Sequence, residues 1–417
     1  MVRIAVIGGG ASGMAAAIEA GEAGAEVILL EHNDRPGKKI NATGNGKCNL
    51  GNSYLNENCY RGGDSAFVQR IFELCSPGDV RQWFTDRGLY LKEKRGYYYP
   101  KSEQAASVVT FFASRLQKAG VIVRFGCEVQ KIRRSKGCFE VTYYDLQKET
   151  TEKTVCDKVI LSTGGLAGQN LGAGPFGYDT AKGFGHVITP LQPALVQLVA
   201  KDKNLKTLSG VRSEAGVHLI TAINGVESYY DEKGEVLFTD YGISGIAVMQ
   251  LSRFAGDALR QDGTARLSID FCPELTFPEL LEVMNANLSD NPSLTVEDCF
   301  CSLLPKKLLY VILLRADIPA DTRCKQLHAE DMRRLCRGVK EFQLPIISTK
   351  DFSMAQVTAG GVALSGVYAD TLESRLRKGL YITGELLDVD GTCGGYNLQF
   401  AFATGILAGR AAAKKDK

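Results

Sequence analysis

The sequence has no long apolar run and little excess charge of either sign. Its 417 residues contain no hydrophobic stretch as long as the roughly 20 residues that a membrane-spanning helix needs. The first residues also lack a charged leader followed by an apolar core and a cleavage site. The formal net charge of +2 gives no electrostatic reason to expect nucleic acid as a partner. We therefore expect a cytoplasmic protein with neither a membrane nor a nucleic-acid partner.

Short-spaced cysteine pairs are also absent, although the chain contains 12 cysteines. There is no C-x-x-C segment of the kind that zinc sites and dithiol redox centres use. Cys299 and Cys301 come closest to such a pair. Histidines and carboxylates do not cluster at metal-ligand spacing either. We expect free thiols in a reducing compartment, no metal site and no dithiol relay.

Glycine, by contrast, is abundant, with 45 residues that gather in clusters. The first cluster follows Arg3–Ile7, a short apolar run typical of a buried parallel strand. It reads Gly8-Gly9-Gly10-Ala11-Ser12-Gly13, which matches G-x-G-x-x-G, and it leads into the helix-permissive segment Met14–Ala23. Glu26–Leu30 then forms a second apolar strand, and Glu31 follows it. This order of elements is typical of a dinucleotide-binding unit.

Each residue of that unit has a physical role. Gly8 permits the tight turn, Gly10 lets the backbone approach a pyrophosphate, and Gly13 lets helix and strand pack closely. The N–H groups at the start of the helix favour the phosphates. Glu31 can accept hydrogen bonds from ribose hydroxyls. Its negative charge would repel a 2′-phosphate, which disfavours an NADP-type ligand at this position.

A second strand–glycine–helix unit lies at the far end of the chain. Gly379–Thr383 is a strand, and the glycine-rich segment Gly384–Gly395 leads into a helix from about Asn397 to Ala413. The positive end of that helix can face N1 and O2 of a flavin, which gain negative charge on reduction. A nicotinamide has no such need, so this unit favours FAD. Ordinary helix packing through small residues is the alternative.

A third apolar strand, Asp157–Ser162, runs into Thr163-Gly164-Gly165. In two-part FAD folds such a strand returns the chain to the nucleotide domain. A helix is expected over Thr180–Gly185, followed by His186. We interpret His186 as a histidine at a helix end rather than a catalytic base.

With these segments assembled, the chain resembles a bacterial flavoprotein family that includes aminoacetone oxidases and BaiN-type bile-acid reductases. The most specific segment is the loop Gly37–Asn49, which in the family wraps the FAD pyrophosphate and reaches the isoalloxazine. Lys38, Lys39 and Lys47 would supply positive charge there, and the glycines free backbone N–H groups. Cys48 beside Lys47 is either a packed cysteine or a reactive thiol of lowered pKa.

The glycine motifs and the resemblance together predict a set of FAD-binding residues in four parts of the chain. They are Gly8, Gly10, Ala11, Ser12 and Gly13 in the first turn and helix; Glu31, His32, Lys38, Lys39, Thr43, Gly44, Asn45, Gly46, Cys48 and Asn49 after the second strand; Val129, Thr163, Gly164 and Gly165 in the middle; and Gly384, Glu385, Asp390, Gly395, Asn397 and Leu398 at the far end.

The resemblance has one departure. A family segment T-H-x-G-x-S-G-P reads Thr239–Ile246 here, with Asp240 in place of the histidine and Ile246 in place of the proline. Any chemistry that used that histidine is in doubt for this chain. Tyr241 and Tyr396 are candidate proton donors, with a purely structural role as the alternative for each.

The middle of the chain predicts two further structures. Ala194–Ala200, Gly216–Ala222 and Glu235–Thr239, the last after a turn at Asp231–Gly234, suggest an antiparallel, barrel-like unit. From Phe277 to about Val339 the pattern is helical, with apolar faces. One face would carry Leu280, Val283 and Met284, and another Leu303, Leu304, Leu308 and Leu309.

The predicted fold is α/β: a two-part Rossmann-like FAD-binding domain with an inserted β-barrel-like domain and a helical cap. The expected order is the first FAD-binding part (1–190), the first part of the inserted β domain (191–265), the helical cap (266–340), the return strands of the β domain (341–362) and the second FAD-binding part (363–417). Substrate would lie between cap and flavin, since ligands often bind between domains.

The predicted function is that of an FAD-dependent oxidoreductase. The resemblance implies hydride transfer from flavin N5 to the conjugated C=C bond of a 3-oxo steroid or bile-acid-like enone. Because the sequence has one dinucleotide fingerprint, NAD(P)H would be a transient donor. The alternatives are an aminoacetone-type amine oxidase using O₂ and a non-catalytic flavin sensor. The sequence leaves the oligomeric state open.

Overall fold

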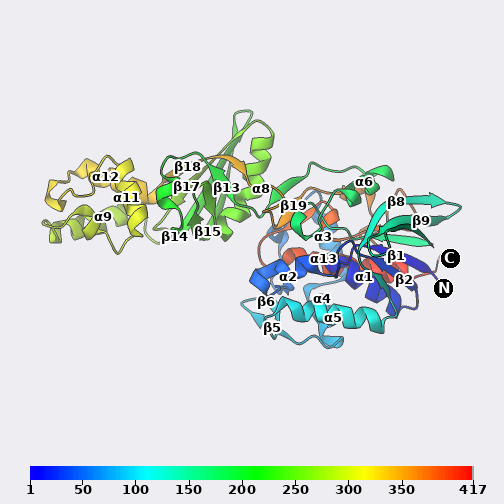
Figure 1. Ribbon diagram of the computed structural model, residues 1–417. Coiled ribbons are helices and arrows are strands. Elements are labelled where there is room, and N and C mark those ends of the chain that lie inside the picture. Colours follow the sequence, from blue (N-terminus) through cyan, green and yellow to red (C-terminus); the bar gives the residue numbers. More distant parts are fainter. Residues whose placement is uncertain (416–417) are drawn as a thin grey trace. The chain divides into compact units, whose positions relative to one another are not determined.

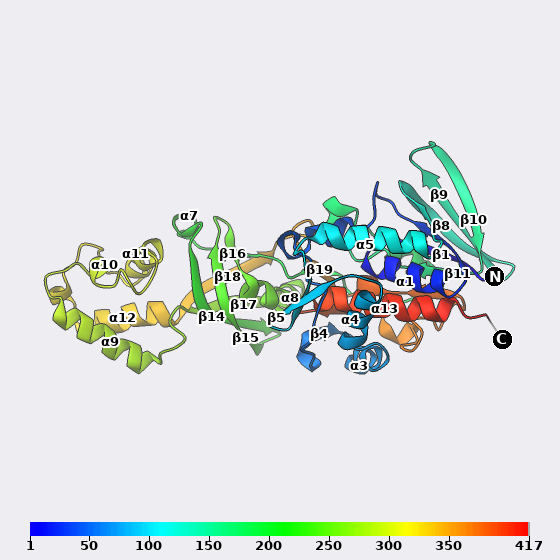
Figure 2. The ribbon, with the colours of Figure 1, turned by 90° about the horizontal axis from the view of Figure 1, so that it is seen from below.

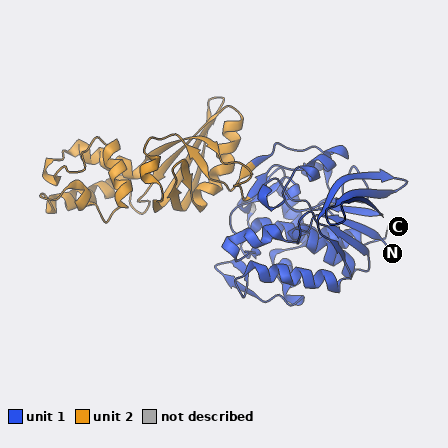
Figure 3. Ribbon diagram, in the orientation of Figure 1, with its two compact units in different colours: residues 1–192, 357–417 blue, residues 193–356 orange. Residues whose placement is uncertain are grey.

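A computed structural model describes residues 1–415, and the chain forms two compact units (Figure 3). Unit 1 combines Met1–Gln192 with the segment from Val357 onward, and unit 2 is Pro193–Gln356. Residues 357–362, predicted as part of the inserted β domain, belong instead to unit 1. Both ends of the described chain therefore lie in one unit.

A five-stranded parallel sheet forms the centre of unit 1 in the described part of the chain. Its strand order is β20 (Leu380–Ile382), β11 (Lys158–Leu161), β1 (Arg3–Ile7), β2 (Glu26–Leu30) and β7 (Ile122–Arg124). Four of these strands were predicted, because a strand buried on both faces is continuously apolar. The edge strand β7 escaped prediction: it is short, and Ile122 is 47% exposed.

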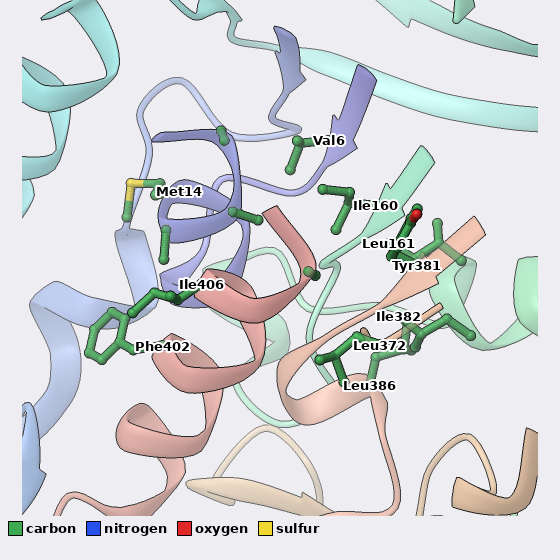
Figure 4. Packing of buried hydrophobic residues seen from close by; sticks show 14 of the residues in the cluster. Val6, Met14, Ile160, Leu161, Leu372, Tyr381, Ile382, Leu386, Phe402 and Ile406 are labelled. Atoms are coloured by element: carbon green, nitrogen blue, oxygen red, sulfur yellow. The ribbon is translucent and has the colours of Figure 1, made fainter. Parts of the chain in front are cut away.

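Two helices from opposite ends of the chain, α1 (Ala11–Glu22) and α13 (Tyr396–Ala412), pack side by side against this sheet (Figures 1 and 2). A Cβ on Gly405 would lie 2.3 Å from the carbonyl oxygen of Ser12. One on Gly409 would lie 2.4 Å from that of Ala16. Figure 4 shows Phe402 and Ile406 of α13 near Met14 of α1. This contact buries apolar surface and joins the chain's two distant segments.

Smaller elements complete unit 1. The helices are α2 (Lys38–Ala42), α3 (Ser65–Leu74), α4 (Pro77–Asp86), α5 (Ala105–Lys118) and α6 (Phe176–Gly183). The strands are β3 (Gly51–Asn52), β5 (Leu91–Lys94) and β6 (Tyr97–Pro100) in one sheet, β4 (Tyr60–Gly62) and β21 (Val389–Gly391) in a second, and β8 (Cys127–Ser135), β9 (Cys138–Asp145) and β10 (Thr150–Cys156) in a third. The chain passes between the units within β12 (Gln192–Ala194) and before β19 (Val357–Ala359).

Unit 2 contains a closed antiparallel barrel, which confirms the barrel-like prediction. Around it the strands run β13 (Leu198–Ala200), β16 (Gly242–Ser244), β15 (Val226–Phe238), β14 (Arg212–Ile223), β17 (Thr264–Asp270) and β18 (Phe342–Thr349). Helix α8 (Ile246–Arg260) contacts each of these strands. Leu219, Phe238 and Leu267 are fully buried in this core.

The predicted turn at Asp231–Gly234 is wrong. These residues lie inside β15, where Asp231 pairs with His218 and Gly234 with Ala215. The chain reverses instead at Asn224 and Gly225, whose φ angles are 50° and 80°. Asn-Gly is the dipeptide that a two-residue hairpin favours, because both positions need positive φ. The charged run Asp-Glu-Lys-Gly is instead one solvated stretch of a long strand.

The helical part of unit 2 follows the prediction. It comprises α9 (Phe277–Asp290), α10 (Val296–Cys299), α11 (Lys306–Arg315) and α12 (Ala329–Lys340). Leu280 and Met284 are each 1% exposed, but Val283 is 55% exposed, so its assignment to the buried face is wrong. Positions four apart share a helix face more closely than adjacent ones.

All twelve cysteines are free thiols. In residues 1–415, no group of three or more His, Cys, Asp or Glu side chains is placed to hold a metal ion. Nor does any helix within these residues combine the length and apolar character needed to cross a membrane.

Strand β16 lies very close to its neighbour β13 at Gly242. A Cβ there would lie 2.0 Å from the carbonyl oxygen of Leu198 on the neighbouring strand. Gly242→Ala should therefore lower the free energy of unfolding by about 1–3 kcal/mol, because the backbone must shift. The matched control is Gly216→Ala on β14, whose Cβ would make ordinary contacts of 3.5–3.6 Å. Urea unfolding of both variants is the measurement, and equal midpoints would contradict the described packing of β16.

Candidate functional site

The turn between β1 and α1 needs glycine at two of its motif positions. Gly8 has φ 105°, and a Cβ on it would lie 2.5 Å from the carbonyl oxygen of Ser162. A Cβ on Gly13 would lie 2.0 Å from the carbonyl oxygen of Gly8. At Gly10, in contrast, a Cβ would meet nothing within 4 Å. Gly8 and Gly13 are therefore required by close backbone contacts, whereas Gly10 borders open space.

The N-terminus of α1 has no side-chain cap among the described residues. Gly10 is the N-cap residue, and its carbonyl accepts from the N–H of Met14 at 3.0 Å. The earlier N–H groups of the helix, those of Ala11, Ser12 and Gly13, have no acceptor within a regular helix. They form the positive end of a 12-residue helix dipole. Such an end is suited to a diphosphate.

Glu31 is held rigidly beside this turn. Its Oε2 accepts from the N–H of Gly9 at 2.6 Å, and its Oε1 accepts from the backbone N and Nδ2 of Asn33 at 2.7 and 2.8 Å. The side chain is buried, whereas its neighbour His32 is exposed. Cys127 donates its N–H to the Glu31 carbonyl at 2.9 Å, which places β8 and its buried Val129 near the end of β2. Asn33, which fixes the carboxylate, was not predicted.

The loop after α2 has an unusual backbone. Gly44, Asn45, Gly46 and Cys48 all have positive φ, at 57°, 53°, 81° and 56°. From Gly44 to Lys47 the loop is exposed, while Thr43 and Asn49 are half-buried. The exposed part of the loop offers backbone groups to a ligand.

The loop's lysines have protein partners. Lys39 pairs with Glu385 at 2.7 Å, which joins the loop to the far end of the chain. Lys38 donates to Asn33 Oδ1 at 3.1 Å. Lys47 lies 3.6 Å from Glu103. The positive charge at the site is therefore partly compensated by these residues.

Cys48 is fully buried. Burial raises the pKa of its thiol to about 12, because a thiolate is poorly solvated away from water. This favours the packed-cysteine interpretation over a reactive thiol.

Thr358 links the segment after β11 to the segment after β20. Its Oγ1 accepts from the N–H groups of Leu166 and Ala167 at 2.8 and 3.0 Å, and its own N–H donates to Glu385 Oε1 at 2.9 Å. A Cβ on Gly165 would lie 2.4 Å from that hydroxyl. Thr163 and Gly164, the latter with φ 75°, precede this contact. Thr358 was missed because no sequence motif marks it.

The N-terminus of α13 is built from backbone and amide groups. Gly395, with φ 93°, is its N-cap residue, and a Cβ there would lie 2.7 Å from Asn49 Oδ1. Asn397 accepts from the N–H of Gly391 and donates to its carbonyl, both at 2.8 Å. Gln399 accepts from the N–H of Asn52 at 2.6 Å. Its buried Nε2 has no partner among the described residues.

The remaining predicted residues lie around these groups. Gly384 donates its N–H to Thr404 at 3.0 Å, and a Cβ on it would lie 2.7 Å from Ser12 Oγ. Asp390 is buried in β21, where it lies opposite Arg61 of β4 in the strand register. Leu398 is half-buried in the first turn of α13.

These residues fit a dinucleotide such as FAD. The ends of α1 and α13, uncapped by side chains among the described residues, and the open space at Gly10 are each features that a bound molecule would satisfy. Two of them come from opposite ends of the chain.

The two candidate tyrosines lie in different units. Tyr396 is 5% exposed, and its ring meets that of Tyr60 edge-on at 5.7 Å. Burial and the neighbouring Cys59 raise its pKa well above the ordinary value, which suits a phenol that stays protonated. Tyr241 belongs to unit 2, where Lys350 Nζ lies 3.7 Å from its ring centroid. Asp240 beside it is exposed.

The Thr358 hydroxyl accepts two backbone hydrogen bonds, which we expect to stabilise the fold. Thr358→Val keeps the shape but removes the only side-chain acceptor shown for two N–H groups, at least one of them buried. The free energy of unfolding should fall by roughly 2–3 kcal/mol, since buried unpaired donors are costly. Thr358→Ser, which keeps the hydroxyl, is the control and should stay much closer to the parent. Equal stability of the valine and serine variants in urea unfolding would show that the hydroxyl has no such role.

The buried His186 should make the stability of the fold depend on pH. It is buried after α6, its Nε2 hydrogen-bonds with Ser374 Oγ at 2.8 Å, and burial lowers its pKa from 6.5. The unfolded chain then binds a proton more readily than the folded one, so stability falls as pH drops below about 6.5. His186→Gln should reduce the slope of unfolding free energy against pH between about 5 and 7. An unchanged slope in the variant would contradict a neutral buried imidazole.

The comparisons with known proteins agree with this geometry. Residues 2–411 match the HI0933-like protein Rossmann domain. The chain is 40% identical over 417 residues, all of both chains, to a 3-dehydro-bile acid delta(4,6)-reductase of Clostridium scindens. It is 30% identical to ribosomal RNA dihydrouridine synthases of Escherichia coli and Haemophilus influenzae, covering 96% of this chain and 95% of each relative. The chain therefore belongs to the HI0933-like family and is an oxidoreductase, as the resemblance implied.

Proposed function

We propose that unit 1 binds FAD and that the protein reduces a C=C bond conjugated to a carbonyl group. The main support for FAD binding is a pair of helix N-termini, those of α1 and α13, which come from opposite ends of the chain. Neither has a side-chain cap in the described residues. When bound, FAD supplies hydride transfer from flavin N5 to the carbon β to the carbonyl.

The chain's own residues would hold the cofactor as follows. The first N–H groups of α1 would bind the diphosphate, and Glu31 would accept from the ribose hydroxyls. The positive end of α13 would face the pyrimidine edge of the flavin. Tyr396, whose raised pKa keeps the phenol protonated, is our candidate to hold the substrate's carbonyl oxygen or donate a proton.

For the substrate we propose a 3-oxo steroid enone of the bile-acid type. The support is the 40% identity over the whole length of a relative named as a 3-dehydro-bile acid delta(4,6)-reductase. NAD(P)H would act as a transient donor, in the cytoplasm.

A second candidate substrate is uridine in RNA. Two relatives of 30% identity are named ribosomal RNA dihydrouridine synthases. Their names too describe the addition of hydrogen to an unsaturated ring. The net charge of +2 does not favour RNA, and the identity to these relatives is lower.

The test follows the flavin colour without oxygen. The purified protein is mixed with NADH or NADPH, and absorbance near about 450 nm is recorded before and after a substrate is added. We expect bleaching by the nicotinamide and return of colour with a 3-oxo-Δ4 steroid. The control is the same steroid lacking the double bond, which should leave the flavin reduced.

Other outcomes would contradict the proposal in distinct ways. Return of colour with unmodified ribosomal RNA and not with the steroid would favour the second candidate. Bleaching by an aminoketone, reversed by air, would identify an amine oxidase.

A further inference from the structure

A separate cavity of about 640 Å³ lies in unit 1. It is lined by the turn after α4, from Arg87 to Tyr90, by Pro100–Ser102 after β6, and by residues of α5 between Ser107 and Arg115. None of these residues belongs to the predicted FAD-binding set. Leu116 and Phe112 of α5 are buried in the core, so the cavity lies on the other face of that helix.

The cavity's charge is of one sign. Its lining includes three cations, Arg87, Lys101 and Arg115, and no carboxylate. Arg87 is compensated by Glu19 and Glu22, at 2.8 and 2.5 Å. Arg115 and Lys101 have no ion-pair partner within residues 1–415. Two positive charges are therefore available to a ligand.

The rest of the lining is apolar or carries hydroxyl groups. Leu89, Pro100 and Phe111 supply apolar surface, and Arg115 lies 5.8 Å from the Phe111 ring centroid. Ser102 and Ser114 supply hydroxyls. A cavity with both features suits a molecule that has an anionic group and a flat ring.

We propose that this cavity binds a nucleoside phosphate, at a site separate from that of FAD. Guanidinium and ammonium groups are the usual partners of phosphate oxygens, and the Ser114 hydroxyl can donate to a further oxygen. The apolar wall at Leu89 and Phe111 accommodates the base. Arg87 also lines the cavity, but its charge is already paired with Glu19 and Glu22.

The protein contains a natural reporter for this site. Trp83 is the single tryptophan. It is buried, the Arg87 guanidinium lies 4.5 Å from its ring centroid, and the Phe111 ring lies 6.3 Å away. A ligand that contacts Arg87 or Phe111 should therefore change Trp83 fluorescence.

The experiment titrates the FAD-loaded protein with ADP, inorganic phosphate and adenosine, following Trp83 fluorescence and heat of binding. We expect saturable ADP binding that leaves the bound FAD in place and is tighter than binding of phosphate or adenosine. The double variant Lys101→Gln, Arg115→Gln should weaken ADP binding at least about tenfold, from the loss of two charge-assisted contacts. Lys118→Gln, an exposed position on the same helix, is the matched control and should bind like the parent.

Three results would overturn the proposal. They are ADP binding of unchanged affinity in the double variant, phosphate or adenosine binding as tightly as ADP, and release of FAD by ADP. The first would exclude this cavity, the second the two-part ligand, and the third a separate site. A denaturation curve of the double variant matching that of the parent shows that its loss of binding is not a loss of fold.

Discussion

The direct backbone contact between α1 and α13 is the constraint on which unit 1 depends. At Gly405 and Gly409 the partner helix is so close that any side chain would collide with a carbonyl oxygen. The same holds at Gly13, where the turn after β1 folds back on the helix. Glycine is needed at Gly405 and Gly409 because the two helices touch backbone to backbone, and at Gly13 because the turn touches its own helix. This contact brings two segments nearly 400 residues apart into one core.

That contact also determines the chemistry of the site. Within residues 1–415 the N-terminus of each helix has no side-chain cap, and Glu31 and Asn397 bond to backbone groups beside these ends. Thr358 and Glu385 hold further backbone groups of unit 1. The site is thus assembled chiefly from main-chain donors that buried side chains hold in place. Such an arrangement binds and orients a cofactor that carries its own reactivity. It also explains why no catalytic cluster of histidines or carboxylates was needed to predict an oxidoreductase.

The sequence predicted the parts of the molecule that obey local rules. The parallel strands are continuously apolar, and the glycine spacing marks the turn, so β1, β2, β11, β20, α1 and α13 were all anticipated. The barrel was predicted as a class, but its hairpin was misplaced because a charged run was taken for the turn in place of Asn224-Gly225. Thr358 could not be found, since its partners Leu166 and Ala167 are remote in sequence. Asn33 was missed although its partner Glu31 is only two residues away, because the glycine motif draws attention to the acid alone. Lys39 was predicted to carry positive charge to the site, but its pairing with Glu385 depends on the tertiary fold.

We propose that both ends of the chain together hold one FAD. The most direct measurement is the cofactor content of the purified protein: its absorbance spectrum, followed by identification and quantification of the nucleotide released on denaturation. We expect a yellow protein that releases FAD in a one-to-one ratio with the chain. A colourless protein that takes up no FAD when the cofactor is added would contradict it.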